Sequence, residues 1–268
     1  MALLSVEELS FAYRDREVLR GITFSVDAGE VLGLVGPNGC GKTTLIRCAD
    51  GMLSPHNGRV MFKGKELGTM HRREVARAMA YVPQSTGNRT SSTVFETVLM
   101  GRRPYLNWTV SCADEDKVAE ALRLLDLEGL ALRKVGELSG GERQRVMIAR
   151  ALVQETGVVL LDEPTSNLDV CHQMGVMEVL RGLAEEKGLA IVIALHDLNL
   201  AATYCHRLLV LSAGSIYSYG APEEVLTEEM LGSVYGIEAV VKRDLPAPYV
   251  VPIRPGRVRE GGERPPIS

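Results

Sequence analysis

The sequence lacks an apolar run long enough to cross a lipid bilayer as a helix. Its apolar runs are short, as in Val158 to Leu161, Ala190 to Leu195 and Leu208 to Leu211, whereas a spanning helix needs about 20 apolar residues. The N-terminus has no basic stretch, no long apolar stretch and no cleavage pattern of a signal peptide. We therefore expect a cytoplasmic protein that acts at a membrane only through a partner.

The sequence is also poor in paired cysteines and in positive charge. It has five cysteines, an odd number, and no Cys-x-x-Cys pair, which disfavours a disulfide framework or a zinc site. The formal net charge of −4 disfavours nucleic-acid binding, which usually shows as a basic excess. The 46% hydrophobic and 24% charged residues over 268 positions are typical of one large folded α/β domain or two small ones.

The order of patterns along the chain divides it into regions. Three strands separated by turns are predicted before residue 36, and helical spacing of apolar residues prevails from about 84 to 155. Short apolar runs then return, each ending at a polar residue, which is typical of buried parallel strands with functional groups at their carboxyl ends. Six of the twelve prolines follow Val241, so we expect residues 241–268 to form a proline-rich extension that is irregular or partly disordered.

A glycine-rich segment between a predicted strand and a predicted helix matches the phosphate-binding pattern G-x-x-x-x-G-K-[ST]. Its glycines allow consecutive backbone N–H groups to turn toward phosphate oxygens, and the following helix adds the positive end of its dipole. We expect Lys42 to reach the β- and γ-phosphates and the Thr43 hydroxyl to contact Mg²⁺. The predicted nucleotide-binding residues here are Gly36, Pro37, Asn38, Gly39, Cys40, Gly41, Lys42, Thr43 and Thr44.

Cys40 lies inside this loop, where the helix N-terminus and Lys42 could lower its pKa. A redox switch at Cys40 is one hypothesis. The simpler interpretation is a small side chain that is tolerated among backbone donors.

Two adjacent carboxylates end the apolar strand that begins at Val158. Asp162 is the candidate to hold Mg²⁺ in a protein with a phosphate-binding loop. Glu163 follows directly and can act as general base on the water that attacks the γ-phosphate. An acidic surface turn would explain the same residues, but the phosphate loop favours the catalytic interpretation.

The string LSGGERQ, from Leu138 to Gln144, is the most specific in the chain. Ser139 and Glu142 form the S-x-x-E pattern of a capping box at a helix start. Gly140 and Gly141 permit close approach to this helix N-terminus, which is suited to bind a γ-phosphate. The string resembles the signature motif of ATP-binding-cassette (ABC) ATPases, and it precedes the acidic strand at the spacing usual in that family.

The resemblance covers roughly the first 240 residues and implies roles for four more side chains. Tyr13 matches the aromatic residue that stacks on adenine, and Gln84 matches the glutamine that senses Mg²⁺ and water. Asp169 matches the acid that closes the loop crossing to the opposite subunit. His196, which ends a predicted strand, matches the histidine that contacts the γ-phosphate, although a lone histidine there is more often structural.

The family implies a P-loop NTPase (RecA-like) core of α/β class, with an antiparallel β subdomain and an inserted helical signature subdomain. On this basis residues 1–240 form the nucleotide-binding domain, with the helical subdomain at about 85–155. The cofactors implied are ATP and Mg²⁺. Because the signature motif faces the nucleotide of a second subunit and one cassette occurs here, the chain is expected to pair with a second copy of itself.

Further strings resemble the importer ATPases for iron–siderophore, haem and cobalamin uptake. They include Gly101 to Tyr105 with Trp108, Leu168 to Gln173, and Leu195 to Asn199. The resemblance implies a separate permease dimer, an extracytoplasmic substrate-binding protein, and a position on the cytoplasmic face of the membrane. It places the permease contact at 102–108, although Tyr105 and Trp108 could instead be packing residues.

Other ABC machines remain as alternatives at this point. An exporter is normally fused to membrane spans, and a DNA-repair cassette carries a long heptad insertion, neither of which is visible. A translation factor usually carries two cassettes. A soluble iron–sulfur assembly ATPase has one, so only its partner would distinguish it. A simple P-loop kinase would lack the string at Leu138 to Gln144.

Overall fold

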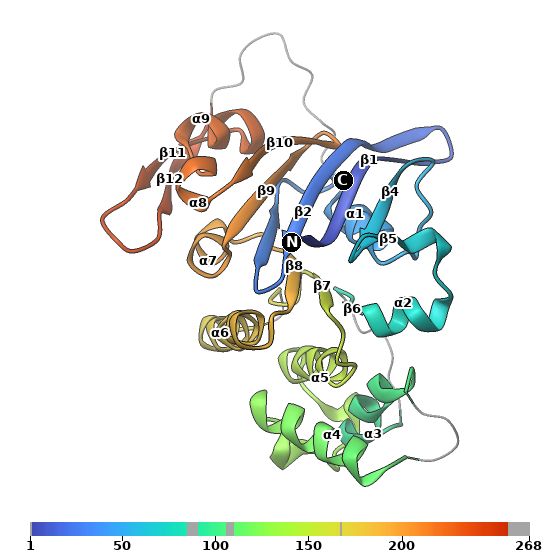
Figure 1. Ribbon diagram of the computed structural model, residues 1–268. Helices are drawn as coiled ribbons and strands as arrows, with labels where there is room; N and C mark the ends of the chain where they lie inside the picture. The colour runs from blue at the N-terminus through green and yellow to red at the C-terminus, as the bar shows by residue number, and fades with distance from the viewer. Residues whose placement is uncertain (1, 85–90, 106–109, 167, 257–268) are drawn as a thin grey trace.

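A six-stranded sheet runs through the centre of the molecule. The computed structural model describes residues 2–84, 91–105, 110–166 and 168–256 (Figure 1). The strand order is β10-β9-β3-β8-β7-β6, in which all neighbours are parallel except β10 and β9. The strands are β3 (Val31–Val35), β6 (Met79–Val82), β7 (Val158–Asp162), β8 (Ala190–Ala194), β9 (Arg207–Ser212) and β10 (Ser215–Gly220).

A second, antiparallel sheet has the order β2-β1-β4-β5. Its central strand pairs Leu4 with Val26 on one side and with Phe62 on the other. Figure 1 shows helix α1 (Lys42–Ala49) beside this sheet. The strands are β1 (Ala2–Tyr13), β2 (Arg16–Asp27), β4 (Asn57–Phe62) and β5 (Lys65–Glu66).

Alternate residues of the central strands face two different cores, because successive side chains in a strand point to opposite faces. In β7, Val158 and Leu160 pack with α1 and the antiparallel sheet, whereas Val159 and Leu161 pack with the helices on the other face. All five residues of β7 are buried. Burial on both faces explains why this strand appears in the sequence as an uninterrupted apolar run.

The helices between β6 and β7 form a separate cluster beyond the central sheet (Figure 1). They are α3 (Val94–Leu99), α4 (Cys112–Leu124) and α5 (Gly140–Leu152), with the 3₁₀ turns η2 (Met100–Arg102), η3 (Glu128–Leu130) and η4 (Val135–Glu137) between them. None of the helices in the described part of the chain is both long and apolar enough to span a membrane. The other α-helices are α2 (Arg72–Ala78), α6 (Val170–Lys187), α7 (Leu198–Tyr204), α8 (Pro222–Val225) and α9 (Glu228–Met230).

The irregular extension expected after Val241 is wrong as far as Pro255. Strands β11 (Ile237–Lys242) and β12 (Tyr249–Pro255) form an antiparallel hairpin, so residue 240 lies inside a strand. Asn199 of α7 holds the hairpin, since its Nδ2 donates to Val250 O at 3.2 Å and its Oδ1 accepts from Val250 N at 2.7 Å. The prolines of β12 are tolerated because this strand lies at an edge and pairs with β11 alone.

Candidate functional site

The predicted catalytic and phosphate-binding side chains meet at one edge of the central sheet. Strands β3, β8, β7 and β6 are consecutive parallel neighbours. The glycine-rich loop follows β3, His196 follows β8, Glu163 follows β7, and Gln84 follows β6. Because parallel strands end at the same edge, residues far apart in sequence come together here.

The glycine-rich loop has a backbone that requires glycine. Gly36, Gly39 and Gly41 have φ angles of 148°, 77° and 112°, a region that residues with a side chain rarely adopt. A Cβ atom on Gly36 would lie 2.2 Å from Leu211 O, and one on Gly41 would lie 2.8 Å from a Leu19 methyl carbon. The loop is therefore a tight, preformed turn at the start of α1.

Lys42 folds back over this loop. Its side chain is buried, and Nζ donates to Gly36 O at 2.7 Å and to Pro37 O at 3.3 Å. The ammonium group is therefore held at the mouth of the turn by two carbonyl oxygens. A phosphate bound in the turn would meet this charge directly.

Thr43 and Asp162 lie side by side. The Thr43 hydroxyl donates to Asp162 Oδ1 at 3.0 Å, and the carboxyl group of Asp162 is almost fully buried. Burial raises the pKa of Asp162, while Thr43 and the nearby Arg47 and Lys42 lower it. A hydroxyl and a buried carboxylate at the phosphate loop are the oxygen donors that Mg²⁺ takes, so these residues fit the predicted metal.

Glu163 carries the most constrained side chain of the site. Gln84 Nε2 donates to its Oε2, and His196 Nε2 lies 2.5 Å from its Oε1. The backbone of Glu163 has φ of 49°, which is uncommon for a residue with a side chain and costs about 1–3 kcal/mol where it occurs.

A cavity of about 150 Å³ lies between the phosphate loop and Glu163. Glu163 lines it together with residues of the phosphate loop, so the candidate base faces the position predicted for phosphate. Val18 of β2 also lines it, and the sequence contained no pattern that would single out this apolar strand residue. The lining residues are Val18, Asn38, Gly39, Gly41, Lys42, Thr43, Thr44 and Glu163.

The redox hypothesis for Cys40 assumed a lowered pKa of its thiol, and this assumption is wrong. The Cys40 side chain is buried, and burial raises the pKa of its thiol above the ordinary value. Lys42 and backbone N–H groups lower it, but by less. The thiol is a small buried group beside Gly36, as the simpler interpretation has it.

The signature segment begins α5 with a complete capping box. Ser139 Oγ accepts from Glu142 N at 3.2 Å, and Glu142 Oε2 accepts from Ser139 N at 2.7 Å. Gly140 is exposed and Gly141 is partly exposed. None of these residues lines the phosphate cavity of its own chain, so the structure does not bring the signature motif to the phosphate loop within one subunit.

Two further predicted residues lie apart from the cavity lining. Tyr13 ends β1 with 45% of its surface exposed and packs edge-on against Phe11, at 4.8 Å between ring centroids. Asp169 caps α6 by accepting from His172 N at 2.9 Å and contacts His172 Nδ1 at 2.8 Å. Both are open to a ligand or a partner. Asn167 and Trp108 lie outside the described residues.

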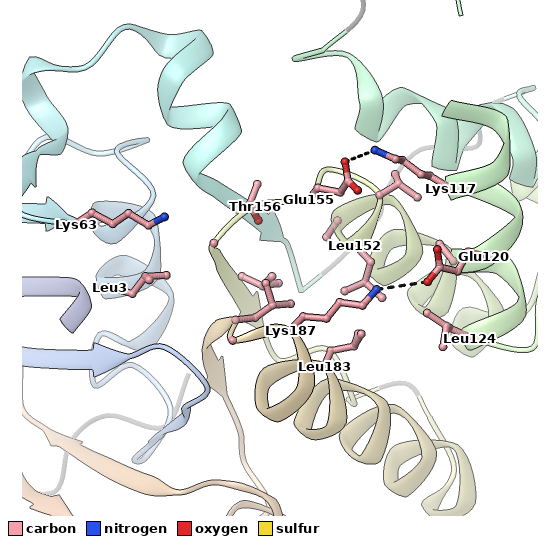
Figure 2. Close-up of a pocket in the computed structure, with 17 residues that line it drawn as sticks. Leu3, Lys63, Lys117, Glu120, Leu124, Leu152, Glu155, Thr156, Leu183 and Lys187 are labelled. Carbon is pink, nitrogen blue, oxygen red and sulfur yellow. Dashed lines mark hydrogen bonds and ion pairs between the residues drawn. The ribbon is translucent and has the colours of Figure 1, made fainter. Parts of the chain in front are cut away.

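A larger cavity of about 440 Å³ lies away from the phosphate loop (Figure 2). It opens between α4, the end of α5, the end of α6 and the start of β1. Lys187 and Glu120 both line it, and Lys187 Nζ lies 3.4 Å from Glu120 Oε1. It contains none of the residues predicted for nucleotide binding or catalysis, and it therefore does not change the position of the candidate site.

Comparisons with known proteins show the family to which the chain belongs. The family model for the ABC transporter matches residues 19–166. The petrobactin import ATP-binding protein FpuC of Bacillus anthracis is 41% identical, over 94% of this chain and 93% of its own. The hemin import ATP-binding protein HmuV of Thermobifida fusca is 41% identical over 94% and 89%. The dimeric structure of MJ0796, a bacterial ABC transporter cassette, superposes with a TM-score of 0.75 at 26% identity, over 82% of this chain and 98% of that one.

Proposed function

Because this chain belongs to the ABC transporter family, we propose that it is the ATP-hydrolysing subunit of a membrane importer for an iron chelate, haem or cobalamin. The observation that carries the hydrolytic part is the position of Glu163, which lies between Gln84 and His196 and faces the phosphate loop. The relatives named for import of petrobactin and hemin support the direction of transport and the substrate class.

The phosphate loop supplies the binding site for ATP. The turn at Gly36 to Gly41 presents backbone N–H groups to the phosphates, and Lys42 exchanges its two carbonyl partners for phosphate oxygens. Tyr13, exposed at the end of β1, would stack on the adenine. The other residues of the phosphate loop proposed to bind the nucleotide are Pro37, Asn38, Gly39, Cys40 and Thr44.

Thr43, Asp162 and Gln84 would hold Mg²⁺. Thr43 would bind through its hydroxyl and Asp162 through its buried carboxylate, while Gln84 reaches the same edge from β6. When bound, the ion neutralises charge that develops on the phosphates during transfer. Lys42 and the amide groups of the loop supply the rest of this stabilisation from the protein.

Glu163 acts as the general base in the proposed mechanism. Its carboxylate accepts a proton from the attacking water, and Gln84 and His196 fix the position of its two oxygens beside the cavity that Glu163 lines. His196 is 45% exposed by its side chain, so it can also contact the γ-phosphate from the open side of the site.

The cassettes of this family dimerise, and the active unit is a pair. We propose that Ser139, Gly140 and Gly141 bind the γ-phosphate held by the second copy. The loop that Asp169 closes would cross to the second copy at the same interface. Two observations support this arrangement. Ser139 and Gly140 at the start of α5 are exposed, and they do not line the phosphate cavity of their own chain. Two nucleotides would then be enclosed by one dimer.

The chain acts with a membrane permease, which fixes its place in the cell. We propose that it lies on the cytoplasmic face of the membrane through a permease dimer, which receives substrate from an extracytoplasmic binding protein. We further propose that residues 1–240 form the nucleotide-binding domain, with the helical subdomain at about 85–155 and an extension at 241–268. The described tail, up to Pro255, is folded onto α7 by Asn199.

Affinity capture from native membranes tests this proposal. The tagged Glu163→Gln chain is recovered with ATP and Mg²⁺, and its partners are identified by mass spectrometry. A permease with many spans together with a binding protein is expected, and the ligand of that binding protein then identifies the substrate. The same chain with Lys42→Ala is the control. Recovery of soluble partners alone would contradict the proposed role in an importer, whereas the proposed ATPase activity would still stand.

A further inference from the structure

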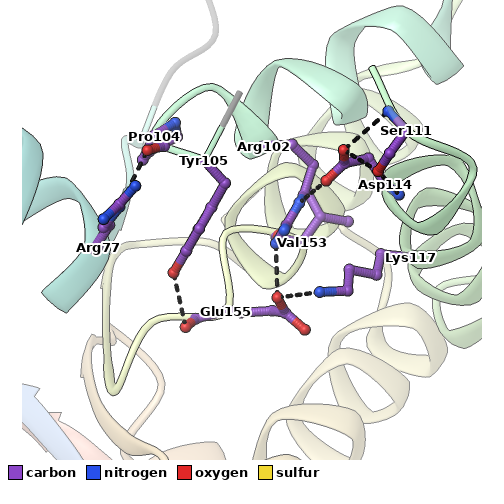
Figure 3. A network of polar contacts seen from close by, with 9 residues as sticks. All are labelled: Arg77, Arg102, Pro104, Tyr105, Ser111, Asp114, Lys117, Val153 and Glu155. Carbon is purple, nitrogen blue, oxygen red and sulfur yellow. Dashed lines mark hydrogen bonds and ion pairs between the residues drawn. The ribbon is translucent and has the colours of Figure 1, made fainter. Parts of the chain in front are cut away.

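Arg102 is a buried arginine at the C-terminal end of α5, the helix that begins at the signature segment (Figure 3). Its Nε donates to Asp114 Oδ1 at 2.8 Å, and its Nη1 donates to Val153 O at 2.8 Å and to Glu155 Oε2 at 2.7 Å. The ring of Tyr105 covers the guanidinium group, with 4.4 Å between Cζ and the ring centroid. Asp114 also accepts from Ser111, and Glu155 also contacts Lys117, so removing Arg102 would cost chiefly its bond to Val153 O and its charge-assisted bond to Asp114.

The contact with Val153 satisfies a carbonyl that a helix cannot satisfy by itself. Val153 is the C-cap residue of α5, and the last carbonyl groups of a helix have no partner within it. A positive side chain is also favourable there because of the helix dipole. Arg102 therefore caps α5 at its C-terminus while Ser139 caps it at its N-terminus.

Gly101 brings the two backbones into contact at the same place. A Cβ atom on Gly101 would lie 2.1 Å from Arg150 O in the last turn of α5, so any other residue would push η2 away. This close approach is what lets Arg102 reach Val153 O. The pair Gly101-Arg102 thus forms one docking element for the end of the helix.

Arg102 also joins parts of the chain that lie on either side of α5. Asp114 belongs to the first turn of α4, where it takes part in the capping box of Ser111. Glu155 lies between α5 and β7, and Lys117 of α4 contacts it at 2.5 Å. Strand β7 leads from there to Asp162 and the base Glu163.

We infer that Arg102 is a positioning residue that holds α5 at the angle at which its N-terminus meets the nucleotide of the second subunit. The inference rests on the proposed function. A helix of 13 residues is about 20 Å long, so a tilt of about 10° at its C-terminus would move Ser139 by about 3 Å. A shift of that size breaks a hydrogen bond. Neither Arg102 nor its acceptors line the phosphate cavity.

The test separates ATP binding by one chain from ATP-driven pairing of two chains. In the Glu163→Gln background, Arg102→Gln is compared with the parent for the monomer's ATP affinity by calorimetry and for the chain concentration at half-dimerisation by analytical ultracentrifugation. We expect the affinity for ATP to stay within about threefold and the concentration at half-dimerisation to rise at least about 10-fold. Glu155→Gln is the milder variant, should Arg102→Gln not fold.

Arg207→Gln is the matched control for lost stability. Arg207 is another arginine paired with a carboxylate, since its Nη2 donates to Glu30 Oε2 at 2.6 Å; its side chain is 30% exposed, against 6% for Arg102. It lies in β9, and its acceptors are Glu30 and Ser25, neither of which belongs to α5. We expect it to lower the melting temperature comparably and to leave dimerisation unchanged. Unchanged dimerisation in the Arg102 variant, or an equal change in both variants, would overturn the inference.

The parent protein distinguishes this failure from a failure of the proposed function. If the Glu163→Gln parent binds ATP and does not dimerise, the proposed pairing is wrong and the role of Arg102 is wrong with it. If the parent dimerises and the Arg102 and Glu155 variants do so equally well, only the role of Arg102 is wrong.

Discussion

His196 Nε2 lies 2.5 Å from Glu163 Oε1, although the two residues follow different strands, β8 and β7. The other carboxylate oxygen of Glu163 accepts from Gln84. One oxygen of the base therefore accepts from Gln84 and the other lies beside the His196 imidazole, and the Glu163 side chain is 10% exposed. A carboxylate held in this way cannot rotate out of the cavity without losing two contacts, which is the preorganisation that a general base requires.

Replacing the base should stop hydrolysis and preserve binding. We expect Glu163→Gln to lower kcat by about 100-fold or more, because the amide cannot accept the proton of water. ATP should still bind, and the ATP-bound dimer should accumulate on gel filtration. Glu178→Gln, the same change on an exposed face of α6, is the control. Turnover within twofold of the parent would remove Glu163 from the base role.

His196→Ala tests the orienting contact. We expect kcat to fall about 10- to 1000-fold with a smaller change in KM, because Glu163 loses one of its two neighbours and the open side of the site loses a donor. Steady-state ATPase assays measure both constants. A rise in KM with kcat preserved would assign His196 to nucleotide binding alone.

Lys42→Ala should abolish ATP binding. The buried ammonium group supplies the only lysine charge in the cavity lining, and we expect the Kd for ATP to rise at least about 100-fold. Titration calorimetry measures it, with Lys63→Ala on an exposed turn as control. Micromolar affinity for ATP in the Lys42→Ala variant would contradict the proposed role of the phosphate loop in ATP binding.

The cysteines should differ in reactivity as their burial predicts. Cys112 and Cys171 are exposed, whereas Cys40, Cys48 and Cys205 are buried, and burial raises the pKa of Cys48 and Cys205 to about 12. We expect N-ethylmaleimide to modify the two exposed thiols of the native chain at pH 7 and to reach Cys40 at least about 100-fold more slowly. Peptide mass mapping measures this, and rapid modification of Cys40 would restore the redox hypothesis.

Asp50 should make stability depend on pH. Burial raises the pKa of Asp50 from 3.8 to about 7 in the folded chain, so the folded state favours the protonated form. Its ionisation therefore costs stability increasingly from about pH 4, and the full cost is present above pH 7. Asp50→Asn should gain on the order of 1 kcal/mol at pH 8 and much less at pH 5.

Urea unfolding of the Asp50 variant and its parent at the two pH values measures this difference. Asp116→Asn, an exposed aspartate of α4, is the control. An equal gain at pH 5 and pH 8 would show that ionisation of Asp50 is not its cause.

The sequence by itself determined the features whose residues are close along the chain. The phosphate loop lies within nine residues, and its glycines are needed locally, because Gly36 and Gly41 occupy positive φ. The capping box of Ser139 and Glu142 is also local, at a spacing of three residues. These patterns could be recognised without a fold because the atoms that interact belong to one turn of backbone.

Only the tertiary structure decided which distant groups touch. Gln84, Glu163 and His196 meet because β6, β7 and β8 are neighbours, an order that no local pattern encodes. The contact of Arg102 with Val153 and the folding of the tail onto Asn199 likewise depend on long-range packing. Burial of the Cys40 thiol reversed the pKa shift expected from its neighbours in sequence, because desolvation is set by everything that surrounds a group in space.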